Sequence, residues 1–100
     1  MIVDDELSAG LLAYLQKGVA ASPRADEAAC AASATIREPD VLLAEVKGLV
    51  RESLSVPVDW DSMRPGDAGH HVVAEMAKRH PELSQDALEA LAWNFTFAWR

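Results

Sequence analysis

The hydrophobic positions of this chain recur with the period of an α-helix in several segments, most clearly in the last one. Between Leu83 and Arg100, apolar residues fall three or four positions apart and form one stripe when the segment is wound as a helix. Ser84 is placed to cap this helix through its hydroxyl group, with Leu83 before the cap ready to pack on the first turn. The stripe consists of Leu88, Leu91, Ala92, Phe95 and Trp99.

Two more aromatic residues of this segment, Trp93 and Phe97, point almost directly away from the stripe. A helix that is apolar on two sides has to be covered on two sides. Two alternatives follow: either this is the central helix of the domain, or its second side binds a partner, most simply a second copy of the chain. We therefore treat Trp93 and Phe97 as candidate partner-binding residues.

Two helices are expected in the first part of the chain. The first is predicted to begin at Asp4-Asp5-Glu6, whose carboxylates suit the positive end of a helix dipole, and to end near Ala20. Its stripe repeats every four residues and consists of Leu7, Leu11, Leu15 and Val19. The second is predicted over Arg24 to Ile36, with Ser22 as N-cap and Pro23 at the first helical position. It is rich in alanine, so it is expected to be thin, or else a frayed surface segment.

The middle of the chain predicts two longer helices. One begins at Asp40, directly after Pro39, and its apolar stripe consists of Leu42, Val46, Leu49 and Val50. The other opens at Pro65 and runs to about His80, with Glu75 and Arg79 one turn apart and suited to an ion pair. Its core face consists of Ala68, Val72, Met76 and Ala77.

Residues 55–64, between these two helices, show no helical period and are predicted to form an irregular loop. Trp60 stands in this loop between two aspartates. Loops often carry binding residues, so Trp60 is a third candidate for partner binding. The alternative is that its indole folds back and closes the end of the bundle.

The chain is therefore predicted to be all-α, a compact bundle of about five helices in one domain over residues 1–100. No strand is expected. The predicted core consists of Leu7, Leu11, Leu15, Leu42, Val46, Leu49, Val72, Met76, Leu88, Leu91, Phe95 and Trp99.

Composition narrows the function classes. Half of the 100 residues are hydrophobic and a quarter are charged, which is typical of a globular protein. The net charge of −7 disfavours nucleic acid as a partner, because binding to a phosphate backbone needs clustered Lys and Arg. An acidic surface favours solubility, and it also steers basic partners toward the protein.

The predicted location is the cytoplasm. Cys30 has no second cysteine to pair with, and its alanine-rich surroundings indicate a small buried hydrophobic residue. Asp4-Asp5-Glu6 stands where a secretion signal needs positive charge, and no apolar run approaches the length of a membrane span. No membrane association is therefore expected.

The sequence contains one weak metal-binding motif and no clear catalytic motif. His71 and Glu75 lie one turn apart with His70 adjacent, which invites a metal-dependent enzyme as an alternative. Metal sites need three or four converging ligands, however, and these residues place only two on one face. No catalytic residue, metal site or cofactor is predicted, because no nucleophile stands out and no Gly-rich phosphate loop follows a strand.

One stretch resembles the acyl carrier proteins: an apolar helix, residues 42–54, followed by Asp61-Ser62-Met63. In that family a serine in an Asp-Ser-Leu motif carries phosphopantetheine at the start of a helix. The resemblance implies a carrier protein modified at Ser62. The chain departs from the family pattern at Trp60, where the family has glycine, and at residues 64–66, where an apolar helix should follow.

The preferred interpretation is a small acidic protein without catalytic activity that acts by docking to a protein partner or to itself. Regulatory subunits, toxin-neutralising inhibitors or immunity proteins, and adaptors act in this way. Tryptophan and other aromatic residues dominate the energetics of binding interfaces. The predicted partner-binding residues are therefore Trp93, Phe97 and Trp60.

Overall fold

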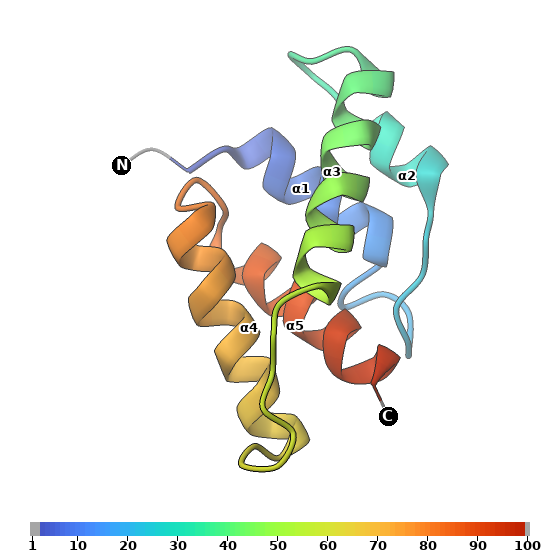
Figure 1. The fold of residues 1–100 in the computed structure, drawn as a ribbon. Coiled ribbons are helices and arrows are strands. Elements are labelled where there is room, and N and C mark those ends of the chain that lie inside the picture. The colour runs from blue at the N-terminus through green and yellow to red at the C-terminus, as the bar shows by residue number, and fades with distance from the viewer. Residues whose placement is uncertain (1–2, 100) are drawn as a thin grey trace.

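The described part of the chain folds into five α-helices (Figure 1). The computed structural model describes residues 3–99, so Arg100, the predicted end of the last helix, lies outside the described residues. The helices are α1 (Asp5–Leu15), α2 (Glu27–Ala32), α3 (Pro39–Leu54), α4 (Pro65–Arg79) and α5 (Gln85–Ala98). Residues 3–99 contain no strand, and the Cα radius of gyration of 13.1 Å is that of a compact chain of this length. The prediction of an all-α bundle is confirmed.

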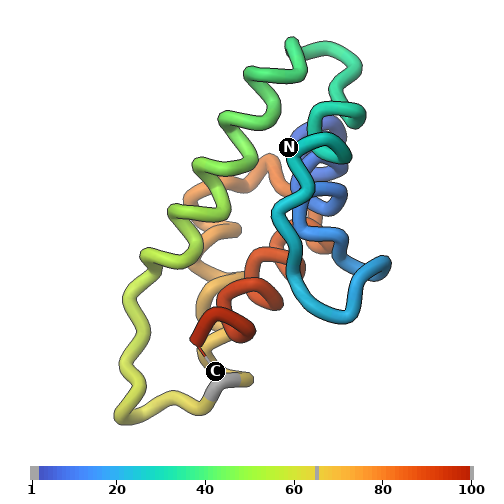
Figure 2. Tube along the Cα trace, turned by 90° about the vertical axis from the view of Figure 1, so that its right-hand side faces the viewer, coloured from blue at the N-terminus to red at the C-terminus, as the bar shows by residue number. Residues whose placement is uncertain are grey.

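The last helix is the central one. α5 contacts α1, α3 and α4, and the two views show it crossing beneath α3, with α1 and α2 together on one side (Figures 1 and 2). Phe95 on α5 is the largest of the fully buried side chains. Of the twelve predicted core residues, only Trp99 is not buried. The apolar stripe of α5 is therefore buried in the bundle, whereas the second side of the helix, with Trp93 and Phe97, is only partly covered.

The helices whose limits were predicted well begin at a capping residue or at a proline. The Ser84 hydroxyl accepts a hydrogen bond from the Ala87 N–H at 3.1 Å and starts α5. Proline occupies the first position of α3 and of α4, where a missing N–H removes no helical hydrogen bond. The predicted ion pair is present on α4, with Arg79 Nε 3.1 Å from Glu75 Oε1.

The predicted end of α1 near Ala20 is wrong, because the helix stops five residues earlier at Leu15. Gln16 takes up a left-handed conformation with φ of 58°, and Gly18 follows with φ of 84°. Val19, predicted to continue the apolar stripe, is 84% exposed. The last carbonyls of α1 are instead satisfied by the returning chain: the Arg24 N–H donates to Leu15 O and the Asp26 N–H to Tyr14 O.

The predicted second helix over Arg24 to Ile36 is also wrong in extent. Ser22-Pro23 lies in the connection that returns along α1, and α2 occupies only Glu27–Ala32. Asp26 caps it by accepting a hydrogen bond from the Ala29 N–H at 2.9 Å. Cys30 is fully buried on this short helix, as predicted, and burial raises the pKa of its thiol.

A charged network that the sequence pattern did not indicate holds α1 to the segment before α3. Glu6 is buried on α1, and its carboxylate accepts hydrogen bonds from the backbone N–H groups of Thr35, Ile36 and Arg37. The Arg37 guanidinium also lies 2.7 Å from Glu6 Oε1 and pairs with Asp4. These contacts, the hydrogen bond from the Ile36 N–H first among them, lower the pKa of Glu6 to about 2 from its ordinary 4.5.

None of the helices within residues 3–99 is long and apolar enough to cross a lipid bilayer.

Two glycines inside helices differ in their surroundings, and this difference predicts opposite effects of alanine. A Cβ at Gly48 on α3 meets no atom within 4 Å, so Gly48→Ala is expected to raise the free energy of unfolding by about 0.5–1 kcal/mol. A Cβ at Gly10 on α1 lies 3.2 Å from two carbons of the fully buried Leu42 side chain. Gly10→Ala is expected to lower the free energy of unfolding by about 1 kcal/mol through overpacking. Equal gains in urea melts would contradict the close packing of α1 on α3.

Candidate functional site

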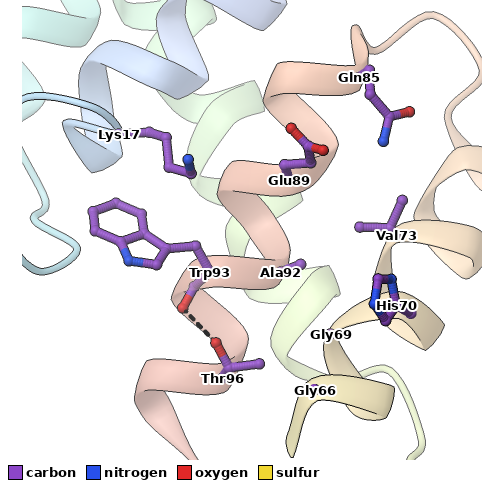
Figure 3. Close-up of a pocket in the computed structure, with 10 residues that line it drawn as sticks. All are labelled: Lys17, Gly66, Gly69, His70, Val73, Gln85, Glu89, Ala92, Trp93 and Thr96. Atoms are coloured by element: carbon purple, nitrogen blue, oxygen red, sulfur yellow. Dashed lines mark hydrogen bonds between the residues drawn. The ribbon is translucent and has the colours of Figure 1, made fainter.

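An open groove of about 570 Å³ runs along α5, between α4 and the segment that follows α1 (Figure 3). Small residues, Gly66, Gly69 and Ala92, form much of its floor, and Glu89 and Thr96 project from α5 in the middle, between Lys17 and Trp93 on one side and His70 and Val73 of α4 on the other. The residues that line it are Lys17, Gly66, Gly69, His70, Val73, Gln85, Glu89, Ala92, Trp93 and Thr96.

The floor depends on Gly69, which allows α4 to approach α5 closely. A Cβ at this position would lie 3.3 Å from Thr96 Cγ2 and 4.0 Å from the Ala92 Cβ. The Thr96 hydroxyl donates a hydrogen bond to Trp93 O, so its polar atom is already satisfied by its own helix. The base of the groove is therefore narrow and mostly apolar.

Trp93 forms one wall of this groove, on the side toward α1. Its ring is partly buried against the core, and the Lys17 ammonium lies 5.8 Å from the ring centroid, within reach of a cation–π interaction (Figure 3). Trp93, a predicted partner-binding residue, is thus half-buried. Lys17 lies beyond the end of α1, and Glu89 lies one turn before Trp93, so the groove carries charges of both signs.

A second feature lies at the C-terminal end of α5, where Trp60 folds back from the loop onto the helix. The Trp60 ring is stacked on Phe95 with centroids 6.1 Å apart and an angle of 8° between planes. It also contacts Trp99, with centroids 5.9 Å apart. Of the two alternatives for Trp60, the folded-back position is the one adopted, although 42% of the residue stays exposed.

Trp99 corrects one prediction, because it was assigned to the core and is 56% exposed. It occupies the C-cap of α5, beyond the last turn that the other helices cover. Phe97 is 42% exposed on the same terminal turns. Three of the six aromatic residues of the chain are therefore exposed near the C-terminal end of α5, Trp60 and Trp99 in contact on one side of the helix and Phe97 on the opposite side.

The three residues considered as metal ligands, His70, His71 and Glu75, make separate contacts. His71 Nε2 hydrogen-bonds the carbonyl oxygen of Pro57 at 3.0 Å, and Glu75 pairs with Arg79 and Lys78. His70 lines the groove instead. Over residues 3–99, no group of three or more His, Cys, Asp and Glu side chains is placed to hold a metal ion.

Ser62, the residue implied by the resemblance to acyl carrier proteins, is exposed in a turn before α4. Its hydroxyl donates a hydrogen bond to Asp59 Oδ2 at 2.9 Å. The family places its serine at the start of a helix, whereas α4 begins three residues later at Pro65. The hydroxyl is accessible, but its local setting is a turn held together by Asp59.

Comparison of the chain with protein families, curated proteins and solved structures finds no match. The function has to be argued from the geometry of the chain itself.

Sequence reasoning identified Trp60, Trp93 and Phe97 as site candidates, but it assigned Trp99 to the core and missed the other residues that line the groove. Lys17 falls within the predicted span of the first helix and Glu89 falls outside the apolar stripe of the last one, so neither residue stood out in the sequence. The pair Gly66 and Gly69 inside a predicted helix was the available signal, because a helix seldom carries glycine without a close neighbour or a functional reason. Only Gly69 has such a neighbour in the structure.

Proposed function

We propose that this chain is a protein-binding module without catalytic activity that docks a partner against the C-terminal end of α5. The observation that carries the proposal is the exposure of Trp60 and Trp99, which are in ring contact on one side of the helix end, with Phe97 exposed on the opposite side of the same end. Large aromatic side chains are usually buried, and a surface that gathers several of them is typical of an interaction site. Tryptophan is also enriched among the residues that contribute most to binding free energy.

The architecture supports docking rather than rearrangement. Phe95 is buried directly beneath Trp60 and Trp99, with ring centroids about 6 Å from both, so the exposed rings rest on the core. A surface already ordered in the free protein loses less conformational entropy on binding. The groove beside Trp93 runs along the same helix and carries the charged groups of Lys17 and Glu89, although none of the three exposed aromatic residues lines it. Cytoplasmic action is part of the proposal, on the composition arguments given above.

The proposal predicts that partner binding is lost when the exposed aromatic residues are replaced, while the fold is kept. The double variant Phe97→Ser with Trp99→Ser is expected to lower the free energy of unfolding by about 1–3 kcal/mol and to leave the chain folded, because both side chains are only half buried. Affinity capture from lysate of the native cell, followed by mass spectrometry, should recover a protein with the wild-type chain and not with this variant.

A matched control removes an exposed apolar side chain elsewhere. Ile36 is 90% exposed in the segment between α2 and α3, at the opposite end of the molecule in Figure 1. Ile36→Ser is expected to retain the captured partner. Light scattering on the purified wild type separates self-association from binding of a different protein. A partner that remains bound to the Phe97/Trp99 variant would contradict the proposal.

A further inference from the structure

The exposed rings of Trp60 and Trp99 form a platform with a fixed geometry. Their centroids are 5.9 Å apart with 46° between planes, and both rings contact the buried ring of Phe95. Trp60 and Trp99 are 42% and 56% exposed, so each presents aromatic surface to a ligand. The face of an indole ring is electron-rich and attracts cations, more strongly than the ring of tyrosine or phenylalanine.

The charged residues of the loop that carries Trp60 are mostly negative. Asp59 and Asp61 stand on either side of Trp60, and Asp67 lies in the first turn of α4, against the one cationic residue of this stretch, Arg64. Asp59 and Asp67 accept backbone or side-chain hydrogen bonds in their own turns. The exposed Asp61 carboxylate makes no hydrogen bond or ion pair with the residues that the structure describes.

Building on the proposed function, we infer that the partner is a basic protein segment that presents an arginine side chain to Trp60 and Trp99. Its guanidinium group stacks on the exposed indole surface and donates hydrogen bonds to the Asp61 carboxylate. Arginine fits better than lysine, because a planar guanidinium stacks on an aromatic face and also matches a carboxylate in a bidentate contact. The net charge of −7 adds long-range attraction for a basic segment.

The charge balance also favours a basic partner over a second copy of the chain. Two copies with a net charge of −7 each repel one another at long range, and the end of α5 would meet its own acidic loop in a two-fold pair. A basic segment brings the opposite sign. If the chain pairs with a second copy instead, light scattering on the purified wild type detects the dimer.

The test is a titration of the isotope-labelled chain with two short synthetic peptides, followed by NMR of the three tryptophan indole N–H signals. One peptide carries two arginines among glycine and serine, and the other carries citrulline in their place, which keeps the shape and removes the charge. The arginine peptide is expected to shift the Trp60 and Trp99 signals saturably, with Kd in the range of about 1 mM, and to leave Trp93 nearly unchanged. The citrulline peptide is expected to cause no saturable shift.

Two variants that each remove one negative charge test whether the arginine contacts Asp61. Asp61→Asn is expected to weaken arginine-peptide binding about two- to five-fold, the size of one exposed ion pair. Asp40→Asn, at the start of α3 and away from the platform, is expected to change Kd by less than that. Equal weakening by both variants would show non-specific attraction to an acidic protein and would overturn the inference. Equal shifts with both peptides, or shifts centred on Trp93, would overturn it as well.

The proposed function and this inference fail in different ways. If capture depends on Phe97 and Trp99 but the arginine peptide causes no saturable shift, the binding module stands and the arginine assignment is wrong. A captured partner identified as a second copy, with a dimer in light scattering, likewise overturns the arginine assignment alone. If the peptide binds as described but no protein is captured, the cation site stands without the proposed docking function.

Discussion

Phe95→Ala is expected to lower the free energy of unfolding by about 3–5 kcal/mol, a large part of the total stability of a small domain. Phe95 is 1% exposed and is the largest of the fully buried side chains. Its ring also supports both exposed tryptophans, Trp60 and Trp99. Its removal therefore leaves a cavity in the core and releases the platform above it. Urea unfolding followed by circular dichroism measures the loss.

The chain provides a matched control on the same helix. Phe97→Ala deletes the same ring two residues later, where the side chain is 42% exposed, and is expected to cost no more than about 1 kcal/mol. Glu89→Ala, on the groove side of α5, is expected to cost less than about 0.5 kcal/mol. Similar losses for Phe95→Ala and Phe97→Ala would mean that the helical phase of α5 is wrong.

Glu6→Gln is expected to destabilise the protein at neutral pH and to remove part of its sensitivity to acid. The Glu6 carboxylate is buried, accepts three backbone N–H groups and pairs with Arg37. A neutral amide leaves the guanidinium without this counter-charge and offers one acceptor oxygen in place of two. The loss of melting temperature is expected to exceed that of any exposed carboxylate.

The sign of the pH effect follows from the lowered pKa. Because the pKa of Glu6 is about 2 in the folded chain and 4.5 ordinarily, the unfolded chain binds more protons between these values. The stabilisation is fully present above pH 4.5 and is lost as the pH falls through about 2. In thermal melts over this window, Glu6→Gln should lose less stability on acidification than the wild type. The exposed Glu89→Gln variant serves as control, and parallel curves for wild type and Glu6→Gln would contradict the assignment.

The limits of α3, α4 and α5 follow from the sequence alone, because their signals are local. A proline at the first helical position, the Ser84 cap and an apolar stripe every three or four residues all act within one or two turns. The same periodicity indicated nearly the whole core. It placed Trp99 there wrongly, since phase alone does not say where the covering helices end.

The end of α1 and the short α2 were decided by contacts that the sequence pattern does not show. Leu15 and Val19 fit the apolar stripe equally well, so the pattern does not show that the helix ends between these two residues. It ends at Leu15, where N–H groups of the returning backbone satisfy the carbonyls of Tyr14 and Leu15. Glu6 gives no hint of burial in the sequence, because its partners lie about 30 residues away and are mostly backbone N–H groups.

The candidate site, like the fold, was only partly indicated by the sequence. The sequence by itself identified Trp93 and Phe97, because they point away from the apolar stripe of the last helix, and Trp60, because it stands in a loop. Only the tertiary structure decided that Trp93 borders a groove with Lys17, and that Trp60 rests on Phe95 with Trp99 exposed beside it. Periodicity is a property of one helix, whereas exposure depends on where every other element ends.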